Sequence, residues 1–515
     1  MAVTDSSAER LDRSCLIAVI GAGTMGAGIA QIAAVAGHLV KIFDAEPGLA
    51  DKAIGNIAKN LGKLVDKGRM STVEAQAATT RLSSATSLAD CSKAALVIEA
   101  IVESLETKRR VLAEIEEFVT QDCIIASNTS SISITAIGAG LRNPRRLLGM
   151  HFFNPAPLME LVEVVSGLAT DRRFAEIIHA TAAGWGKVAV HAKSTPGFIV
   201  NRVARPYYAE GLRLLNEQAA TPATIDAVMR EAGGFRMGPF ELMDVIGHDV
   251  SLAVTKSVFN AYYNDPRFTP SLIQQELVNA GFLGRKSGQG FYKYGEGAAK
   301  PEPRAEREAA PPSSVLMHDK SPITAALRAR LTDMGVRVTQ VDTKPNDPLI
   351  EIDAAAVYLT DGRSATQRAA ETDRRDLVLV DLVLDYSTAK RIALARADRC
   401  SDAGYQAIVG LFQVAGFVVT PLADVPGLAV MRTVAMLINE AADVVNQGVC
   451  SLQEVDLAML KGVNYPKGPF AWADEIGVPT VQTVLKNLAT HYGEDRYRIS
   501  PLIQRNAWSG RQFHQ

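Results

Sequence analysis

The chain opens with an apolar run, a glycine-rich turn and a long apolar helical pattern. Leu16–Ile20 predicts a buried strand, and the alanine- and isoleucine-rich stretch 27–36 predicts a helix that stops at Gly37. The next apolar run, 39–43, ends at Asp44. Further apolar runs alternate with helical patterns, at 95–100, 123–126 and 147–150. This alternation is typical of a parallel sheet with crossover helices.

The pattern changes near residue 190 and again near residue 295. Helical patterns dominate from Pro196 to Tyr294, and the next stretch contains four prolines among alternating charges, as a linker does. Apolar runs then return among helices, at 377–380 and 417–419. We therefore expect an α/β Rossmann domain (13–195), an all-α helical domain (196–294), a linker (295–320), a small degenerate α/β domain (321–425) and a second copy of the helical domain (426–515).

The second copy follows from an internal repeat. A shift of 230 positions superposes turn residues and helix caps of the two helical regions without a gap, including Pro196-Gly197 on Pro426-Gly427 and 238–240 on 468–470. The repeat fails at Asn201, which aligns with Met431, and the second α/β region has no GxGxxG motif. We expect one working site, in the first copy, and a second copy kept as a structural partner.

Composition excludes several classes of protein. The 515 residues are 47% apolar and 21% charged, with a net charge of −2 that argues against a nucleic-acid partner. The five cysteines are widely spaced and form no zinc motif, which favours a reducing compartment and no metal site. No apolar run is long enough to span a membrane, and the first fourteen residues do not look like a signal peptide. We expect a cytoplasmic protein.

The glycine-rich turn predicts a dinucleotide site. Its glycines allow a tight turn and close approach of a pyrophosphate, and the helix N-terminus offers amides to it. Asp44 can accept a hydrogen bond from a ribose 2′-hydroxyl, and no arginine follows it to hold a 2′-phosphate. The motif therefore predicts NAD, with a purely structural turn as the alternative. The predicted cofactor-binding residues here are Gly21, Gly23, Thr24, Met25, Gly26 and Asp44.

His151 and Glu163 form the candidate catalytic pair. His151 follows an apolar run, and Glu163 lies twelve residues later in another apolar run, where a buried carboxylate needs a partner. A base and the carboxylate that orients it would explain the pair. From spacing alone, the more common explanation is a loop histidine and a glutamate on the wet face of a strand.

Three predicted strand ends are polar, and in an open parallel sheet ligands bind at that edge. They carry Glu103, the stretch Ser127–Ser131, and His151 with Asn154. Ser127–Ser131 could also be a simple helix cap. We assign Asn154 to the cofactor site.

These motifs together resemble the NAD-dependent L-3-hydroxyacyl-CoA dehydrogenases of fatty-acid β-oxidation. The resemblance is dense over 15–294 and includes Pro196–Arg202 and 284–292. The second half resembles a longer bacterial subgroup, which includes enzymes of phenylacetate breakdown that oxidise 3-hydroxyadipyl-CoA. The resemblance implies an acyl-CoA substrate, either 3-hydroxyadipyl-CoA or 3-hydroxybutyryl-CoA.

The resemblance also implies roles for single residues. His151 is expected to be the general base and Glu163 its orienting carboxylate, while Ser130 and Asn201 contact the substrate's 3-oxygen and its surroundings. Glu103, Lys108 and Asn128 are expected to line the NAD site. For the coenzyme A arm the sequence offers only Lys59, Lys63 and Lys67, and such a run is more often a solvated helix face.

Two other functions remain open from the sequence. A dehydrogenase of a free hydroxy acid, of the gulonate or carnitine type, shares the fold and a similar histidine motif. A non-catalytic binding or structural protein on the same fold is the other alternative, although it need not keep His151, Glu163 and Asn201. In either case we expect the two helical domains to form an internal pseudo-dimer, and the chain to be a possible homo-oligomer.

Overall fold

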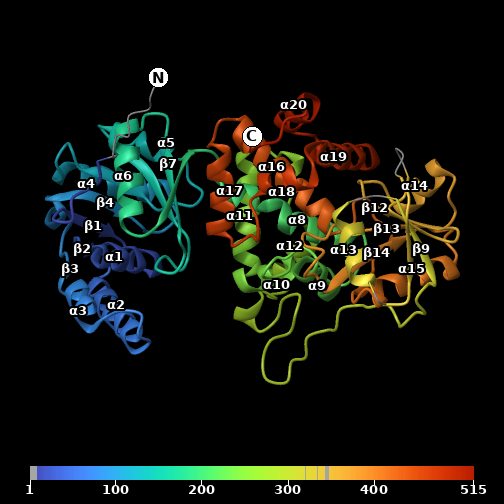
Figure 1. Ribbon diagram of the computed structural model, residues 1–515. Coiled ribbons are helices and arrows are strands. Elements are labelled where there is room, and N and C mark those ends of the chain that lie inside the picture. The colour runs from blue at the N-terminus through green and yellow to red at the C-terminus, as the bar shows by residue number, and fades with distance from the viewer. Residues whose placement is uncertain (1–8, 319–320, 333, 343–346, 515) are drawn as a thin grey trace. The chain divides into compact units, whose positions relative to one another are not determined.

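A computed structural model of the chain describes residues 9–318, 321–332, 334–342 and 347–514. It divides into two compact units (Figure 1). The first contains residues up to Arg202 together with Gln447–Val463, and the second contains Val203–Asn446 and the residues from Asn464 onward. Part of the stretch on which we predicted no signal peptide (1–8), and the end of the predicted linker (319–320), lie outside the described residues.

The first unit is built on an eight-stranded sheet with the order β3-β2-β1-β4-β5-β6-β7-β8. The first six strands have the order of the dinucleotide-binding α/β fold, whose ligands bind where the order reverses, here between β1 and β4. The predicted Rossmann domain is therefore confirmed. Its strands are β1 (Leu16–Ile20), β2 (Leu39–Phe43), β3 (Leu82–Ser84), β4 (Ala94–Glu99), β5 (Ile124–Ser127), β6 (Leu147–Phe152), β7 (Leu161–Ser166) and β8 (Val188–Lys193).

Six helices connect and cover these strands. Helix α1 packs on β1 and β2, and α2 and α3 form a pair beside β3 (Figure 1). The buried faces of α1 and α2 join the strands in one apolar core. The helices are α1 (Thr24–Ala36), α2 (Leu49–Asp66), α3 (Thr72–Thr80), α4 (Leu105–Phe118), α5 (Ile134–Gly138) and α6 (Arg172–Gly184).

The sequence pattern predicted a parallel sheet, but the sheet is not parallel throughout. Strand β7 pairs antiparallel with β6, and β8 then runs parallel to β7. The reason is the connection: a parallel pair needs a crossover of about a dozen residues or more, and the loop between Phe152 and Leu161 is shorter than that. This reversal places His151 directly opposite Glu163 in the register of the two strands.

The second unit contains a seven-stranded mixed sheet with the order β10-β9-β11-β12-β13-β14-β15. Its elements are β9 (Ser314–Met317), α13 (Pro322–Leu331), β10 (Arg337–Gln340), β11 (Ile350–Ile352), β12 (Ala355–Leu359), α14 (Ala365–Thr372), β13 (Leu377–Val380), β14 (Arg391–Arg396), α15 (Asp402–Val414) and β15 (Val418–Pro421). The small α/β domain expected after the linker is therefore present.

The predicted linker is shorter than expected and is not free chain. Ser314–Met317 form β9, because parallel pairing with β10 and antiparallel pairing with β11 supply backbone partners from later in the sequence. Before β9, Glu306 N donates to Val419 O at 2.8 Å, and Ala309 N donates to the Gln413 side chain at 2.9 Å. The proline-rich stretch is thus bound along β15 and α15.

The two helical regions have matching elements at the predicted shift of 230 positions. The first copy comprises α7 (Val200–Val203), α8 (Arg205–Asn216), α9 (Pro222–Glu231), α10 (Pro239–Ile246), α11 (His248–Ala261) and α12 (Leu272–Asn279). The second comprises α16 (Val430–Asn446), α17 (Leu452–Gly462), α18 (Pro469–Ile476), α19 (Val478–Tyr492) and α20 (Pro501–Ser509). Phe198 and Leu428, which the shift superposes, both have positive φ, at 46° and 52°. The same shift relates α6 to α15 and β7 to β14, so the repeat extends into the two sheets.

Within the second unit the two helical copies pack on each other through equivalent elements. Helix α8 contacts α16, and the short 3₁₀ turn η3 (Pro266–Phe268) contacts its counterpart η5 (Asp495–Tyr497). An element that contacts its own equivalent is what an isologous, twofold interface requires. The internal pairing expected from the repeat is therefore seen as contacts between these elements.

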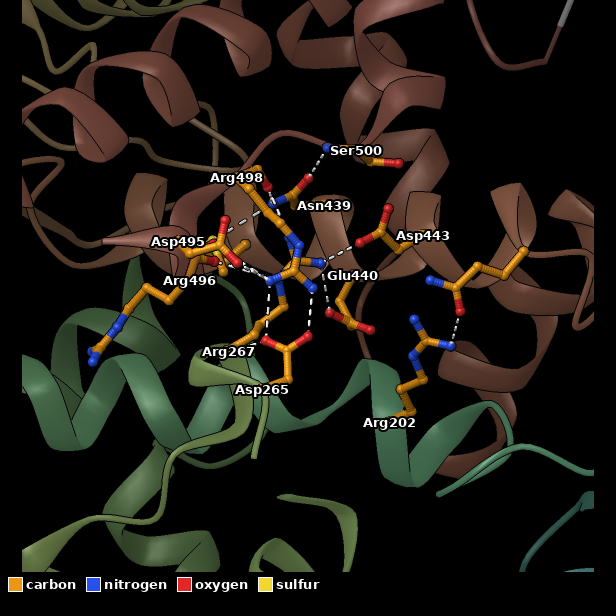
Figure 2. Close-up of polar contacts among 12 residues, drawn as sticks. Arg202, Asp265, Arg267, Asn439, Glu440, Asp443, Asp495, Arg496, Arg498 and Ser500 are labelled. Atoms are coloured by element: carbon orange, nitrogen blue, oxygen red, sulfur yellow. Dashed lines mark hydrogen bonds and ion pairs between the residues drawn. The ribbon is translucent and has the colours of Figure 1, made fainter. Parts of the chain in front are cut away.

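Buried ion pairs hold this pairing together. Arg267 donates to Glu440 at 3.0 Å, to Asp443, and to the backbone oxygen of Arg498 at 2.7 Å (Figure 2). Glu210, which the shift superposes on Glu440, accepts from Arg432 at 2.7 Å, and Arg432 also donates to Glu217. Both arginines and the two equivalent glutamates are almost fully buried, so removing one partner leaves the other unpaired in the interior, which is strongly destabilising.

Two helices that the shift of 230 positions relates, α9 of the first copy and α17 of the second, each contact a sheet. Helix α17 of the second copy contacts β7 and β8 of the first unit, where Glu454 accepts from His191 N at 2.9 Å. Its counterpart α9 contacts β14 in the second unit. Each copy therefore supplies one helix to the sheet that belongs to the other half of the chain.

Candidate active site

The glycine turn has the local geometry of a pyrophosphate-binding turn. Gly21 has φ of 106°, and a Cβ there would lie 2.5 Å from Ala100 O, so only glycine fits. A Cβ on Gly26 would collide with Gly21 O, which explains the third glycine. A Cβ on Gly23 would meet nothing within 4 Å, so this residue faces open space at the start of α1, with no side chain capping the helix. Thr24 and Met25 form the first turn of α1, where free amides attract an anion.

Asp44 lies beside this turn, immediately after β2. Its Oδ2 accepts from Ala22 N at 2.7 Å, and its Oδ1 accepts from Glu46 N at 3.0 Å. The carboxylate is thereby fixed next to the turn, and each oxygen can accept a second hydrogen bond. The residues present therefore fit NAD: Gly21–Gly26 and α1 for the pyrophosphate, and Asp44 for a ribose hydroxyl.

His151 and Glu163 are joined by a short hydrogen bond between adjacent strands. The distance from His151 Nδ1 to Glu163 Oε2 is 2.6 Å, and both side chains are almost fully buried. The other oxygen of Glu163 accepts from the backbone N–H of Ile199 and Val200, at 3.1 and 2.9 Å. Phe153 and Phe198 pack around the imidazole, with ring centroids 4.5 and 5.7 Å away. With Nδ1 engaged, Nε2 is the atom that remains for a substrate.

Glu103 organises the loop after β5. Its Oε1 accepts from the Thr129 hydroxyl at 2.6 Å, from Ser130 N at 3.1 Å and from the Ser131 hydroxyl at 2.9 Å. Partial burial opposes ionisation of Glu103, but the hydrogen bonds from Thr129 and Ser131 and the charge of Lys108 hold its pKa below the usual value. Ser127–Ser131 is therefore more than a helix cap, because a carboxylate from the neighbouring strand end fixes its shape.

Lys108 and Asn128 form polar contacts at the ends of the strands. Lys108 is 1% exposed and donates to Glu99 at 2.6 Å, with Glu103 Oε2 at 3.2 Å. Asn128 accepts from Phe152 N at 2.8 Å, which links the end of β5 to the end of β6. The sequence analysis missed Glu99, a fully buried carboxylate that also accepts from Ser127 at 2.6 Å. Its signal was an acid within the apolar run 95–100.

Asn154 is exposed and Asn201 is half-buried. Asn154 follows the end of β6 by two residues. Asn201 lies in α7, whose first residue, Val200, is one of the two residues whose N–H groups bind Glu163. Asn201 therefore directly follows the backbone segment that binds Glu163, the carboxylate that orients His151.

A cavity of about 750 Å³ runs alongside the glycine turn in the first unit. It is lined by the turn itself, by one face of α2 with Lys52, Asn56 and Asn60, and by Pro155–Leu158, which follow His151. Lys187 also lines it, but donates to Ala156 O and Met159 O, both at 2.7 Å. Lys59, Lys63 and Lys67 are exposed and do not line this cavity, as a solvated face predicts.

The second half has a different arrangement at the corresponding positions. Asp381 lies where the shift places His151, and Ala393 lies where it places Glu163. Asp381 is fully buried and accepts from the N–H groups of Leu382, Ala429, Val430 and Met431, at 2.7–3.0 Å. Burial raises the pKa of Asp381 to about 6, although these N–H groups oppose the shift. In the second half, a carboxylate at the position equivalent to His151 thus binds the N–H groups at the start of the helix.

Comparisons with known proteins match this geometry over nearly the whole chain. The family described as "3-hydroxyacyl-CoA dehydrogenase, NAD binding domain" matches residues 16–195, and its C-terminal domain matches both 197–294 and 427–512. A 3-hydroxyadipyl-CoA dehydrogenase of Escherichia coli is 43% identical over 95% of this chain and 97% of its own length. The chain belongs to the 3-hydroxyacyl-CoA dehydrogenase family. As a member of this family it is an NAD-dependent oxidoreductase, and the match does not favour the alternatives left open by the sequence.

Two further comparisons show how the two halves of this 3-hydroxyacyl-CoA dehydrogenase differ. Residues 357–426 match the "3-hydroxybutyryl-CoA dehydrogenase reduced Rossmann-fold domain", in agreement with the degenerate domain predicted there. A probable 3-hydroxybutyryl-CoA dehydrogenase of Deinococcus radiodurans is 41% identical over 54% of this chain and 99% of its own length. That relative therefore consists of one copy where the present dehydrogenase has two.

A solved structure has the same two-copy architecture. The crystal structure of a 3-hydroxybutyryl-CoA dehydrogenase from E. coli K12 matches with a TM-score of 0.88 and 41% identity, over 97% of this chain and all of that one. Among the residues described in this dehydrogenase, no helix is both long and apolar enough to cross a membrane.

Proposed function

We propose that the chain oxidises an L-3-hydroxyacyl-CoA to the 3-oxoacyl-CoA, with His151 as the general base and Glu163 as the carboxylate that orients it. The observation that carries this is the 2.6 Å hydrogen bond from His151 Nδ1 to Glu163. It fixes the tautomer whose Nε2 accepts the proton of the 3-hydroxyl group. Bound NAD supplies the acceptor for the hydride from C3.

The remaining residues of the site stabilise the charges that change during that proton transfer. Glu163 stabilises the imidazolium that His151 becomes, and is itself held by the N–H groups of Ile199 and Val200. Ser130, on the loop that Glu103 fixes, and Asn201 donate to the 3-oxygen as its charge changes. In the reverse direction the imidazolium returns the proton to the forming alkoxide.

The coenzyme A arm is proposed to lie along the cavity beside α2. Lys52 is exposed there and can meet a phosphate, and Asn56 and Asn60 on the same face can bind amide groups. The cavity is close to Pro155–Leu158, the loop that follows His151, as a thioester near the base requires.

The substrate we propose is 3-hydroxyadipyl-CoA, in a cytoplasmic enzyme. The support is the E. coli relative of that name, which shares both copies of the repeat over 97% of its length. 3-Hydroxybutyryl-CoA is the second candidate, because single-copy relatives and the similar crystal structure carry that name.

The ratio of kcat/KM for 3-oxoadipyl-CoA to that for acetoacetyl-CoA, measured by NADH oxidation, tests the choice. We expect a ratio of at least about 10, because a binding site built for a charged group discriminates strongly against an analogue that lacks it. A ratio below one would assign the enzyme to 3-hydroxybutyryl-CoA instead. Free 3-oxoadipate serves as the control that the coenzyme A arm is needed.

A further inference from the structure

A second cavity, of about 290 Å³, lies wholly within the second unit, beside α8 and the start of α12. Part of its wall is apolar, and this part includes Tyr208, Leu212, Phe268 and Leu272. Among the described residues the wall contains no aspartate or glutamate, but it contains four arginines: Arg205, Arg213, Arg267 and Arg496. Such a wall has a positive potential and favours an anion.

Three of these arginines already have carboxylate partners. The ion pairs join Arg213 to Glu210, Arg496 to Glu494, and Arg267 to both Glu440 and Asp443. The last of these belongs to the contact between the helical copies (Figure 2). Because the charge of each is met within the protein, these three arginines leave no uncompensated charge for a ligand.

Arg205 differs from the other three. It is 8% exposed, and within the described part of the chain its one hydrogen bond goes to the Thr255 hydroxyl, at 3.2 Å. Its guanidinium lies 4.8 Å from the centre of the Tyr208 ring, and its Nε is enclosed without a partner. Burial lowers the pKa of Arg205, as expected for a cation without a counter-charge. A buried guanidinium in this state is costly unless an anion joins it.

The start of α12 is a second feature of this cavity that attracts an anion. Pro270, Ser271 and Leu272 line the cavity where the helix begins. The side chain of Ser271 does not cap the helix, and the first turn contains no acidic residue. N–H groups in a first turn have no partners within the helix and carry a partial positive charge. The helix start and Arg205 therefore favour the same kind of ligand.

The second copy shows that the helical domain can be built without this arginine. The shift of 230 positions places Ala435 at Arg205 and Leu485 at Thr255, and both are fully buried. Two apolar residues thus stand where the first copy has a guanidinium and the hydroxyl to which it donates. Because an apolar pair avoids the cost of an unpaired buried charge, the stability of the fold does not explain the polar pair.

The charge and the apolar wall together indicate the kind of anion. Arg205 leaves one positive charge uncompensated, which one carboxylate neutralises, whereas a phosphate dianion would leave a negative charge enclosed. A carboxylate also matches the planar guanidinium, because it can accept two parallel hydrogen bonds. The cavity extends beyond the guanidinium to Leu212 and Phe268, which offer contacts to an apolar chain.

We propose that this cavity binds a small organic monocarboxylate, with its carboxylate on Arg205 and the start of α12 and its apolar chain against Leu212 and Phe268. All residues of the site belong to the second unit, and the site does not depend on the acid–base pair of the first. Residues of η3 and η5 both contribute to the wall. The bound carboxylate therefore stabilises the contact between the helical copies.

Titration calorimetry of the full chain with three probes tests the proposal. Hexanoate has both a chain and a charge, 1-hexanol has the chain alone, and inorganic phosphate has a charge alone. We expect hexanoate to bind about tenfold or more tightly than either of the others, because a hydrogen-bonded charge is added to the apolar contacts. It should also raise the melting temperature.

The other outcomes of this titration overturn the proposal. Equal binding of hexanoate and 1-hexanol would show an apolar cavity in which Arg205 takes no part. Tighter binding of phosphate than of hexanoate would show a phosphate site. The absence of hexanoate binding would show that the guanidinium stays unpaired.

The double variant Arg205→Ala, Thr255→Leu locates the bound hexanoate. It gives the first copy the residues that the second copy has, so we expect it to fold and to melt no lower than the wild type. Its affinity for hexanoate should be lower by about tenfold or more. Arg205→Lys keeps the charge but not the two parallel hydrogen bonds, and should fall between the double variant and the wild type.

Arg213→Leu is the matched control. Arg213 lines the same cavity but is paired with Glu210, which keeps Arg432 as a partner in the variant. It should therefore weaken hexanoate binding much less than the double variant does. A double variant that binds hexanoate as tightly as the wild type would place the ligand elsewhere and overturn the proposal. An equal loss in Arg213→Leu would reduce the effect to general positive potential and refute the role of Arg205.

Discussion

At the scale of single residues, Glu163 holds two groups at once. One oxygen orients His151, and the other binds the N–H groups of Ile199 and Val200, which precede Asn201. The same carboxylate therefore sets the tautomer of the base and the start of α7. The sequence predicted the pair from spacing, because a carboxylate in an apolar run needs a partner. It could not predict the second contact, which depends on how the chain returns to the sheet after β8.

Glu163→Gln is expected to lower kcat by about 10²- to 10⁴-fold. If the amide oxygen stays on the two N–H groups, its NH₂ group faces His151 Nδ1. That nitrogen must then accept, the proton moves to Nε2, and the base can no longer take the substrate's proton. The kcat and its pH profile check this, with thermal melting as the control for folding. A pH–rate profile identical to that of the wild type would contradict the pairing.

Some of the other site residues could be predicted from the sequence and some could not. The glycine turn and Asp44 were predictable because each glycine has a local steric reason. Glu99 was not, because an acid within a strand becomes informative only when its partners are known.

At the scale of elements, loop length was the signal that the sequence analysis overlooked. The segment from Phe153 to Glu160 is too short for a crossover, so β7 had to turn back along β6. The strand β9 had no such signal, because four residues next to a proline-rich stretch become a strand only through partners later in the chain. By contrast, every helix of the second copy was predictable from the first.

The second sheet keeps a carboxylate at the helix start without keeping the base. Asp381→Ala removes the acceptor of four backbone N–H groups at the end of β13 and the start of α16, each of which costs about 1–3 kcal/mol when left unsatisfied. We expect a clear fall in the free energy of unfolding, measured in denaturant, with kcat/KM at the first site unchanged in the folded protein.

Asp385→Ala is the matched control for that variant. Asp385 is four residues away, but its carboxylate accepts only from exposed Ser387 and Thr388. It should change stability little. If Asp381→Ala were no more destabilising than Asp385→Ala, the carboxylate of the second half would not hold α16.

At the scale of the whole molecule, the chain contains a second copy that a single-copy relative lacks. The relative from Deinococcus radiodurans matches 54% of this chain with 99% of its own length. Helices α8 and α16 pack on each other, with Arg432 and Arg267 buried against acids of the opposite copy. Helix α17 adds contacts to β7 and β8 of the first sheet. The second half is therefore a packing partner for the first, which explains how its own site could lose the histidine.

Truncation after Tyr294 is expected to expose the apolar face of α8 and to strand Glu210 without Arg432. The truncated protein should aggregate or form a new homodimer, because an exposed apolar patch of that kind seeks a partner. Sedimentation velocity of the truncated and full-length chains measures the outcome. A stable, fully active monomer would show that the second half is not needed as a partner.

The most direct test of the account is the full-length His151→Gln enzyme. Because Asp381 and Ala393 occupy the equivalent positions in the second half, no other described histidine–glutamate pair can take over at the corresponding site. We expect NADH to bind as in the wild type, at one per chain, while turnover of a 3-oxoacyl-CoA falls by about 10²- to 10⁴-fold. Turnover within about threefold of the wild type, well below that range, would remove His151 from the chemistry and contradict the account.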